Sequence, residues 1–439
     1  MKFLGLRLCE HDSNISFADG KDVKYYKSER DYQIKHHGFC DLSQWSLILD
    51  RWNIDPKDVD AIGIVIDSFK HPYLNINEKN LYDKIDIPLF KDLGFTCPVY
   101  RIDHHFAHTL SIWPLKKNVD RHFVFDGFGD EYITHSLFQG WEREKYYNDQ
   151  EAPSFGKILS EFGALYGLSG SQYDMAGKVM ALKAYSKMTT EERQINKKTA
   201  SRFNIQFLDK LWDKNILNEL KTDQDKIDFI SMSHEITEDI FAQYFSENCD
   251  DVVSYSGGEA PNSRPSLETI KATAKYLADG KIVAWYQGHG EVGPRALGNR
   301  SILLNPSLRN GKDLINRRVK NREWFRPFGA SVLLEEVSNY FEWEGESPYM
   351  LFAVDVKDKK RFPAITHADG TCRIQTVSNQ LEDYHRLIKE FSNITGIPML
   401  LNTSLNVGGK PIAGRISNAL ELFHSKDIDV LVVGDEICT

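Results

Sequence analysis

Short apolar runs alternate with amphipathic ones over the first hundred residues. The run MKFLGLRL (1–8) predicts a strand, and the turn EHDSNISFADG (10–20) returns the chain into a second one. Residues 43–52 have the spacing of an amphipathic helix. The run AIGIVI (61–66) predicts a buried parallel strand, and PVYRID (98–103) predicts another. Alternating strands and helices of this kind predict an α/β domain.

The same alternation continues along the rest of the chain. HHFAHTLSIW (104–113) has helical spacing, and HFVF (122–125) predicts a strand before a glycine-rich turn. Residues 266–280 predict a helix that leads into the strand KIVAWYQG (281–288), and DVLVVG (429–434) predicts a late strand. With 439 residues and no internal repeat, the chain is long enough for two or more domains with their own cores.

The composition is that of an ordinary soluble globular protein, with 41% hydrophobic and 27% charged residues. A net charge of −9 argues against a surface that coats nucleic acid, although a local basic groove remains compatible with one strand. The six cysteines are scattered without a CxxC pair, so we expect reduced thiols. No apolar run has the length of a membrane span, and residues 1–8 are too short and basic for a signal segment. We therefore expect a cytoplasmic protein that does not bind a membrane.

One stretch, residues 287–332, departs from the acidic average. Between Arg295 and Arg326 it holds nine basic residues against only Asp313 and Glu323. The nine are Arg295, Arg300, Arg309, Lys312, Arg317, Arg318, Lys320, Arg322 and Arg326. Guanidinium forks match pairs of phosphate oxygens, so this mixture suits a triphosphate or an acyl phosphate. The alternative is a solvated basic face on the helix DLINRRVK, although the interleaved aromatic residues favour a partly buried site.

A second candidate site lies in the first half of the chain. His104 and His108 are four residues apart and so share one face of the predicted helix. Asp126 follows at the end of the next strand. Two imidazoles and one carboxylate suit an open site for Fe(II), Mn or Zn. The alternative is that the three residues are unrelated, because this helical spacing recurs by chance.

The sequence also resembles a known family. GEVGPRALGNRSILLNP (290–306) and VKNREWFRPFGASV (319–332) closely resemble segments of the NodU/CmcH/TobZ-type O-carbamoyltransferases. The resemblance implies an enzyme that makes carbamoyl adenylate from carbamoyl phosphate and ATP, with Mg²⁺, and passes the carbamoyl group to a hydroxyl. His289, Gly290 and Gly329 depart from the usual pattern, which affects details of the pocket rather than the class.

For the first half of the chain, the resemblance implies an ASKHA-type domain, which is the ATPase fold of actin, heat-shock chaperones and sugar kinases. DHHFAH and FDGFGDE match family motifs, so His104, His108 and Asp126 are expected metal ligands, with Fe(II) or a similar transition metal. His11 and Lys178 lie in family-like segments and are candidate catalytic residues, and His105 is expected to pack locally. Gly257 and Gly258 belong to a nucleotide-binding or acceptor-binding SGG loop. The family's next motif, P-x-x-x-D-x-G, has no clear counterpart, so the fourth metal ligand is unassigned.

For the second half, the resemblance implies a YrdC-like α/β domain that forms the adenylate. The expected domains are residues 1–265 and 266–439. Lys320 and Arg373 are the expected catalytic groups, with Arg373 as the clamp for carbamoyl phosphate. The expected substrate-binding and nucleotide-binding residues are Arg295, Asn299, Arg300, Arg322, Arg326, His367, Asp369, Thr371, Asn402, Thr403, Ser404 and Asn406.

The expected acceptor is the hydroxyl of a sugar or a natural product, a small-molecule substrate. Three alternatives stay open at this point. The same chemistry would serve a hydroxymethyl group on a nucleotide or on DNA, where the base would be stacked and flipped out. A tRNA threonylcarbamoylation enzyme has the same two module types, and a non-catalytic nucleotide-binding module would keep the loops but lose the metal ligands. The sequence does not fix the oligomeric state, and a homodimer is compatible with it.

Overall fold

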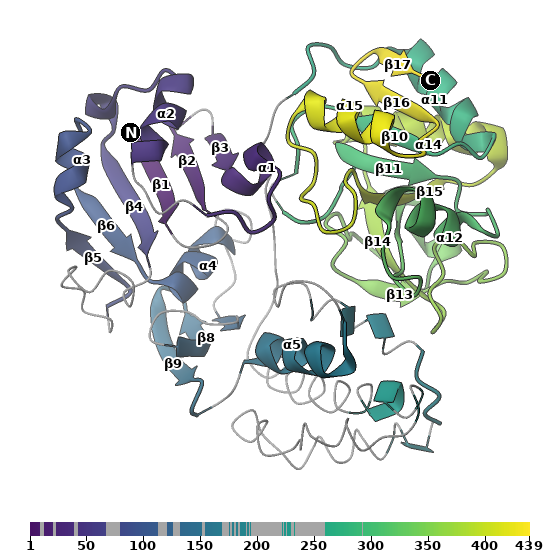
Figure 1. Ribbon diagram of the computed structural model, residues 1–439, viewed down its shortest axis with the longest axis horizontal. Coiled ribbons are helices and arrows are strands. Elements are labelled where there is room, and N and C mark those ends of the chain that lie inside the picture. Colours follow the sequence, from purple (N-terminus) through teal and green to yellow (C-terminus); the bar gives the residue numbers. More distant parts are fainter. Residues whose placement is uncertain are drawn as a thin grey trace. The chain divides into compact units, whose positions relative to one another are not determined.

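The computed structural model of the chain consists of two compact units (Figure 1). Unit 1 comprises residues 1–24 and 39–253, and unit 2 comprises residues 25–38 and 254–439. The residues that the structure describes are 1–8, 13–20, 23–38, 43–66, 80–112, 121–125, 132–151, 154–168, 260–291 and 293–439, with single residues and short runs between 175 and 232.

These units differ from the predicted domains in two places. Unit 2 begins at Ser254 rather than at residue 266, and it also includes residues 25–38 from near the start of the chain. The assignment of separate activities to residues 1–265 and 266–439 stays a prediction. As a statement about packing, it misses the early segment.

A six-stranded sheet in the order β3-β2-β1-β4-β6-β5 belongs to unit 1, except for the last three residues of β3, which group with unit 2. Its strands are β1 (Phe3–Leu8), β2 (Asn14–Ala18), β3 (Val23–Lys27), β4 (Ala61–Ile66), β5 (Tyr82–Ile85) and β6 (Val99–Ile102). β1 pairs antiparallel with β2 and parallel with β4, and β4 is parallel to β6. A Cβ atom on Gly5 would lie 2.6 Å from Oγ of Ser16, so glycine permits the close approach of β1 and β2. The predicted strands at 1–8, 61–66 and 98–103 are confirmed.

A smaller antiparallel sheet, in the order β7-β8-β9, completes the described strands of unit 1. Its strands are β7 (Arg121–Phe125), β8 (Ile133–Gln139) and β9 (Glu142–Asn148). The helices of unit 1 with described bounds are α2 (Ser43–Arg51), the 3₁₀ helix η1 (Pro56–Asp58), α3 (Pro88–Asp92), α4 (His104–Ile112) and α5 (Phe155–Tyr166). The helix predicted at 43–52 and the one predicted from residue 104 are confirmed.

Unit 2 is built on an eight-stranded mixed sheet in the order β13-β14-β12-β15-β11-β10-β16-β17. Its strands are β10 (Val283–Tyr286), β11 (Arg300–Leu304), β12 (Gly329–Leu333), β13 (Ala353–Asp355), β14 (Thr371–Val377), β15 (Met399–Ser404), β16 (Val430–Val433) and β17 (Glu436–Cys438). Every residue of β10 and β11 is buried, as expected for central strands covered on both faces. The α/β class predicted from the sequence is confirmed.

The helical elements of unit 2 are α1 (Ser28–Tyr32), α11 (Leu267–Ala278), α12 (Gly311–Ile315), the π-helix η5 (Asn316–Lys320), the 3₁₀ helix η6 (Leu334–Glu336), α13 (Val337–Tyr340), α14 (Glu382–Thr395) and α15 (Ile416–Ser425). α14 buries Tyr384, Leu387 and Phe391, whose spacing of three and four residues defines one face. The predicted surface helix DLINRRVK is instead split between α12 and the π-helix η5, whose last residue, Lys320, is buried.

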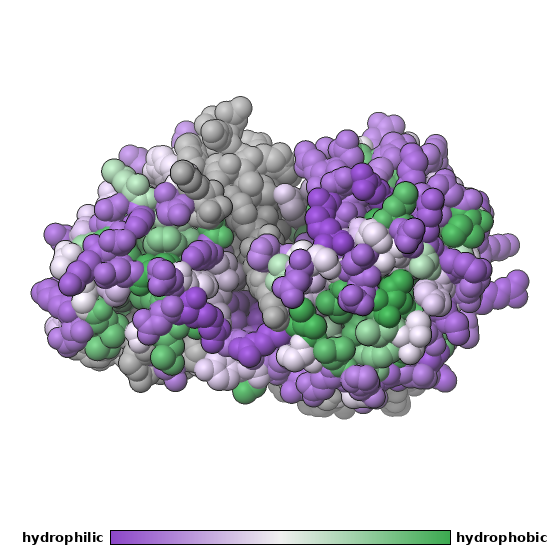
Figure 2. Space-filling model, turned by 90° about the horizontal axis from the view of Figure 1, so that it is seen from above, coloured by the Kyte–Doolittle hydropathy of each residue, from purple (hydrophilic) through white to green (hydrophobic). Residues whose placement is uncertain are grey.

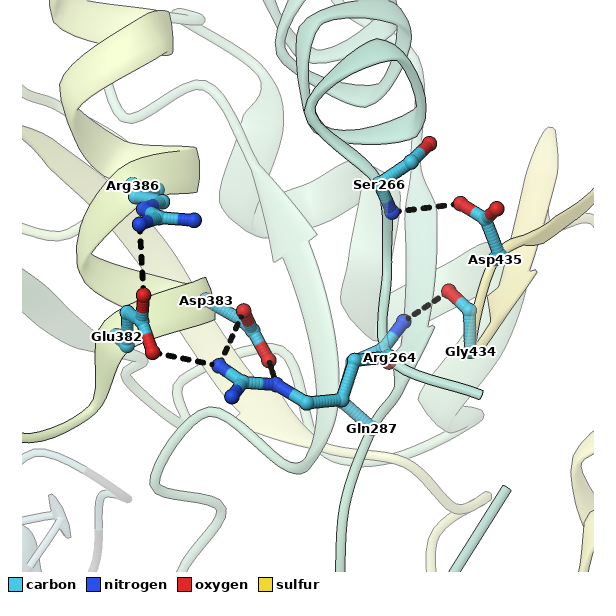
Figure 3. A network of polar contacts seen from close by, with 8 residues as sticks. All are labelled: Arg264, Ser266, Gln287, Glu382, Asp383, Arg386, Gly434 and Asp435. Atoms are coloured by element: carbon cyan, nitrogen blue, oxygen red, sulfur yellow. Dashed lines mark hydrogen bonds and ion pairs between the residues drawn. The ribbon is translucent and has the colours of Figure 1, made fainter. Parts of the chain in front are cut away.

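Polar contacts attach the residues just before α11, Arg264 and Ser266, to α14 and to the turn before β17 (Figure 3). Nε and Nη2 of Arg264 donate to the two carboxylate oxygens of Asp383 at 2.9 and 2.8 Å. The backbone N–H of Ser266 donates to Oδ1 of Asp435 at 2.6 Å, and Ser266 caps α11. These contacts fix where α11 starts against α14 and against the turn before β17.

Three further observations concern helix length, the thiols and the surface. No helix in the described parts of the chain is both long and apolar enough to span a bilayer. Cys97, Cys372 and Cys438 are free thiols. In Figure 2 hydrophilic residues cover much of the visible face of unit 2, and hydrophobic residues gather in patches between them. The predicted cytoplasmic location stays a prediction.

Candidate functional site

The segments that carry the predicted binding residues of unit 2 meet at one edge of its sheet. β15 is antiparallel to β11 and to β12, whereas β12 is parallel to β14. The first residues of β11, β12 and β14 therefore lie at the same edge as the last residue of β15. The loops at this edge hold residues 287–299, 321–328, 366–370 and 405–415. Segments far apart in the sequence are thus brought to one place.

The loop between β10 and β11, residues 287–299, is built around a buried carboxylate. Glu291 is only 4% exposed. Its Oε1 accepts hydrogen bonds from the backbone N–H groups of Leu297, Asn299 and Arg300 at 2.6, 3.0 and 3.2 Å. One side chain therefore fixes the second half of the loop. The sequence analysis did not single out Glu291, which stands just outside the run of basic residues.

Side chains from the strands hold the carbonyl groups of the same loop. Nδ2 of Asn402 donates to the carbonyl oxygen of Ala296 at 3.1 Å, and Nε2 of Gln375 donates to that of Leu297 at 2.8 Å. Asn402 and Gln375 are joined through Oγ of Ser331, at 2.9 and 2.7 Å. These buried donors hold the carbonyl groups of the loop in place, while Oδ1 of Asn402 is buried with no hydrogen-bond partner among the described residues. Asn402, predicted to line the pocket, here bonds the loop backbone.

Arg300 also bonds carbonyl groups of the loop 287–299. Its Nη1 donates to the carbonyl oxygen of Gln287 at 2.6 Å, and its Nη2 donates to that of Gly288 at 3.0 Å. The guanidinium also lies over the ring of Tyr286, 3.5 Å from its centroid. Burial lowers the pKa of Arg300 from its ordinary value, while the charge of Glu291 acts in the opposite direction. Arg300 therefore clamps the start of the loop to its end.

Gly298 allows the loop to pass close to α14. Its φ angle is +107°, and a Cβ atom there would lie 2.3 Å from the ring of Tyr384. Any other residue at this position would meet both backbone strain and a ring that the core holds in place. The loop is thus fixed by a carboxylate, by side chains of the sheet and by packing on α14.

Three arginines of this edge are not neutralised in the same way. Arg295 projects from the fixed loop, Arg373 lies in β14, and Arg326 lies in the loop before β12. The side chain of Arg295 is exposed. Desolvation by the groups around it, followed by the charges of Arg373 and Arg326, lowers the pKa of Arg295 to about 10. Burial likewise lowers the pKa of Arg373. The charges of Arg373 and Arg326 thus both act on Arg295. We call Arg295, Arg326 and Arg373 the arginine cluster.

The arginine cluster lacks matching negative charge. Among the described residues, no carboxylate forms an ion pair with Arg295 or with Arg373. The nearest compensation is Glu323, whose Oε2 lies 3.7 Å from Nη1 of Arg326. Arg326 and Arg373 are half-buried cations, which need partners, and guanidinium forks match the paired oxygens of phosphates and carboxylates. The cluster therefore has the chemistry of a site for a multiply charged anion.

Lys320, predicted to be catalytic, is held at the end of β15. It is 2% exposed, and its Nζ donates to the carbonyl oxygen of Ser404 and to Oδ1 of Asn406, the latter at 2.6 Å. Its own carbonyl oxygen accepts from the N–H of Gly408 at 2.8 Å. Burial, followed by the charges of Arg322 and Arg326, lowers its pKa well below the ordinary value. Its direct role in catalysis stays a prediction, but the structure gives it a second role, as a clasp between η5 and the loop after β15.

We expect Lys320→Met to destabilise unit 2, in addition to any effect on activity. The substitution removes the Lys320 donor of the Asn406 carbonyl oxygen, whereas the Ser404 carbonyl oxygen keeps the N–H of Asn406, and an unsatisfied buried polar group costs about 1–3 kcal/mol. Urea unfolding should show a lower midpoint with an unchanged slope. Lys312→Met, which removes a half-buried lysine of the neighbouring helix α12, is the matched control. A Lys320→Met protein as stable as the control would rule out the clasp.

Two other predicted binding residues, Arg322 and Asp369, form contacts within the protein. Nε of Arg322 donates to Oδ1 of Asn316 at 2.8 Å, and its guanidinium lies over the ring of Phe328. Burial lowers the pKa of Arg322 to about 9. Oδ1 of Asp369 accepts from the N–H and the hydroxyl of Thr371 at 2.9 and 2.8 Å, which closes the turn before β14.

Three of the remaining predicted residues lie at the same edge. The backbone of His367 closes the turn with Thr371, at 2.8 Å, and Thr403 stands opposite Ile302 of β11. The backbone of Asn299 bonds Gln287 and Glu291. Ligand contacts of all these residues stay predictions.

In unit 1, Asp103 positions the helix that carries the two predicted metal-binding histidines. Oδ1 of Asp103 accepts from the N–H of Phe106 at 2.9 Å and so caps α4, while its Oδ2 pairs with Nη2 of Arg143 at 2.8 Å. His105, on another face of α4, is buried with its Nδ1 2.8 Å from Oγ of Ser136. The expectation that His105 packs locally is confirmed.

His104 and His108 converge on this helix. Their Nε2 atoms lie 3.2 Å apart. Two imidazole nitrogens bound to one metal ion at about 2.1 Å, in octahedral or tetrahedral geometry, lie about 3.0–3.4 Å apart. The spacing therefore fits two ligands of one ion. No group of three or more His, Cys, Asp or Glu side chains suited to a metal occurs among the described residues, which do not include Asp126.

The other ring nitrogen of His104 has a partner that bears on metal binding. Nη1 of Arg7 lies 3.1 Å from Nδ1 of His104. Arginine can only donate, so Nδ1 accepts and the neutral ring carries its proton on Nε2. A metal ion on Nε2 requires the opposite tautomer, so the Arg7 guanidinium must turn away from Nδ1 when a metal binds.

Several predicted residues cannot be compared with the structure in full. His11, Asp126, Gly257 and Gly258 lie outside the described residues. Lys178 is helical and 7% exposed, with most of its sequence neighbours not described. Their predicted roles stay predictions.

The features above define unit 2 as an α/β domain that presents an anion-binding arginine cluster on a fixed loop. Residues 274–439 match the family model described as Carbamoyltransferase C-terminus. The resemblance predicted from residues 290–306 and 319–332 lies within this match and is confirmed.

Two relatives illustrate the likeness. Nodulation protein NolNO of Sinorhizobium fredii is 43% identical over 194 residues, which are 43% of this chain and 26% of the relative. The 3'-hydroxymethylcephem-O-carbamoyltransferase of Amycolatopsis lactamdurans is 39% identical over 160 residues, 36% of this chain and 31% of the relative. The chain thus aligns with less than a third of the length of either relative.

Among solved structures, YeaZ from Pseudomonas aeruginosa is similar at 13% identity and a TM-score of 0.22. The similarity covers 34% of this chain and 64% of that one. This score is too low to support an argument. The ASKHA-type and YrdC-like assignments therefore stay predictions, within the α/β class that the sheets show.

Proposed function

We propose that this protein is an ATP-dependent O-carbamoyltransferase that forms carbamoyl adenylate from carbamoyl phosphate and ATP. The observation that supports this proposal most is the arginine cluster. Three cations share one edge of the sheet, and no described carboxylate pairs with Arg295 or Arg373. The cluster lies within the residues that match the carbamoyltransferase C-terminal family.

In the proposed first step, carbamoyl phosphate loses its phosphate to water, and an oxygen of the resulting carbamate attacks the α-phosphorus of ATP. Pyrophosphate leaves, and carbamoyl adenylate remains. Negative charge accumulates on the phosphate oxygens in the transition state, where fixed guanidiniums stabilise it without further reorganisation. Arg295 is suited to this task because Glu291, Asn402 and Gln375 fix the loop from which it projects. Mg²⁺ bound to the triphosphate would offset further charge.

In the proposed second step, the acceptor hydroxyl attacks the carbamoyl carbon, and AMP leaves with the electron pair of the broken bond. His104 and His108 of unit 1 would hold a transition metal for this step, with Asp126 as a further ligand. When bound, such an ion polarises a carbonyl or lowers the pKa of a hydroxyl. The two histidines contribute by converging from adjacent turns of α4, whose start Asp103 fixes.

We expect the purified protein to contain a transition metal, because the Nε2 atoms of His104 and His108 have the separation that one ion requires. The double variant His104→Ala, His108→Ala should lose it, as measured by metal analysis. His105→Gln is the matched control, because it removes an imidazole of the same helix that bonds Ser136 instead. Full metal content in the double variant would contradict the assignment.

For the acceptor, we propose the hydroxyl of a sugar or a natural product. One relative carries an acceptor in its name, a 3'-hydroxymethylcephem, which is a small-molecule alcohol. The sharpest test is to incubate the protein with ATP, carbamoyl phosphate and separate acceptor pools, and to follow pyrophosphate together with the mass of the acceptors. A carbamoyl group on a small alcohol supports the proposal, and one on a nucleotide or DNA replaces the acceptor. No pyrophosphate release in any pool would overturn the proposed function.

A further inference from the structure

A short segment from near the start of the chain packs in unit 2. Residues 25–38 contain the end of β3, α1 and the turns after it, and they group with unit 2 rather than with the residues on either side. The carboxylate of Asp31 pairs with the guanidinium of Arg415 at the start of α15. Nζ of Lys410 donates to the carbonyl oxygen of Gln33 at 3.3 Å. The segment is thus attached to the loop that follows β15.

The same segment reaches the loop that carries Arg295. Nη2 of Arg30 donates to the carbonyl oxygen of Gly293 at 2.7 Å, across 263 positions of sequence. The side chain of Arg30 is only 11% exposed. A Cβ atom on Gly414 would lie 2.8 Å from the carbonyl oxygen of Arg30, so the backbone of α1 is packed closely as well. The contact therefore belongs to the packed interior of unit 2 rather than to its surface.

The charge of Arg30 also interacts with Glu291, the buried carboxylate of that loop. Burial lowers the pKa of Arg30, while the charges of Glu29 and Glu291 act in the opposite direction. Glu291 is the carboxylate on which the loop is built, and the charge of Arg30 also affects the pKa of Arg300. Glu291 is thus influenced by two buried guanidiniums, one from α1 and one from β11.

We propose that Arg30 is a positioning residue for the arginine cluster, because it fixes the first half of the loop that presents Arg295. Gly293, which it bonds, precedes Arg295 by two residues. The bonds to Glu291, Asn402 and Gln375 fix residues 296–300, which follow Arg295. Arg295 is therefore held from both sides, and on the earlier side Arg30 bonds nearest to it, at Gly293, while Arg300 bonds the start of the loop. A preorganised guanidinium loses less freedom when an anion binds, so binding is tighter.

This inference rests on the proposed function only in that the cluster binds an anion. The test is calorimetric titration of the full-length protein with inorganic pyrophosphate and, separately, with carbamoyl phosphate. Arg30→Met should weaken binding at least tenfold, as expected for the loss of a bond from a charged donor. Arg30→Lys, which keeps a charge beside Glu291 without the guanidinium fork, should lie between Arg30→Met and the wild type.

The matched control is Asp31→Asn, which breaks the pair with Arg415 on the same segment and leaves the bond to Gly293 in place. Its affinity should stay within twofold of the wild type. A second readout separates positioning from stability: under the proposed function, Arg30→Met should raise the KM for carbamoyl phosphate more than it lowers kcat. Loss of folded protein would lower kcat and leave KM unchanged.

The outcomes are distinct. If the wild type binds and Arg30→Met binds equally well, the positioning role is overturned and the proposed function stands. If Arg30→Met does not fold, Arg30→Lys decides, and wild-type affinity in that variant overturns the role. A wild type that binds neither pyrophosphate nor carbamoyl phosphate overturns the proposed function, and this inference with it.

Discussion

Replacing Arg373 by methionine should slow pyrophosphate release from ATP and carbamoyl phosphate by about 100- to 1,000-fold. This range corresponds to roughly 2.7–4 kcal/mol, the loss measured when one preorganised donor to a developing anion is removed. Arg373 lies at the sheet edge where β14 begins, and its charge lowers the pKa of Arg295, so both guanidiniums face one region. The rate is measured by continuous pyrophosphate assay at saturating substrates.

The same substitution should leave the free energy of unfolding unchanged or raise it. Without an anion, the partly buried Arg373 forms no ion pair with a described carboxylate and repels Arg295. Lost activity with undiminished stability marks a group that is kept for function. Arg309→Met, which removes an exposed arginine of unit 2, is the control for net charge. Wild-type pyrophosphate release by Arg373→Met would show that the cluster does not act on the phosphates.

Replacing His108 by alanine should abolish carbamoylation of the acceptor while pyrophosphate release continues. The arginine cluster is in unit 2 and His108 is in unit 1, so we expect the two half-reactions to depend on different residues. Loss of an outer-shell partner already costs about 10–100-fold in metal affinity or activity, and the loss of a ligand should cost more. The adenylate should then form and be hydrolysed.

Both half-reactions can be followed in one mixture, by pyrophosphate assay and by the mass of the acceptor. His105→Gln, on another face of α4, should keep both. If His108→Ala stopped pyrophosphate release as completely as Arg373→Met, the separation into two sites would be wrong for this protein.

The sequence predicts elements better than it predicts the targets of polar side chains. The strands at 61–66 and 98–103 and the helix at 104 follow from apolar runs and spacing, which are local properties. Asn402 and Arg300 have residue types that suit a ligand, but in the structure they bond the backbone of residues 287–299. Residue type does not show whether a buried donor faces a ligand or a neighbouring loop.

Glu291 and Arg30 were missed for a related reason. Glu291 lies in a segment that resembles the family. Its residue type and its basic neighbours do not indicate that it accepts from three backbone N–H groups. Its place directly before the glycine-rich turn was the available signal. Arg30 gives no local signal, because its partner is 263 positions away and the helix that carries it has only five residues.

The membership of residues 25–38 in unit 2 has a consequence for biosynthesis. At the usual elongation rates of about 5–20 residues per second, roughly 10–40 s separate the synthesis of Gly38 from that of Ser254. During that interval α1 has left the ribosome, but its binding partners at Gly293 and Arg415 do not yet exist. The nascent chain must keep the buried face of α1 from other contacts until its last residues are made. Such non-local closure slows folding, so the final docking of α1 is expected to be a late event in the maturation of the protein.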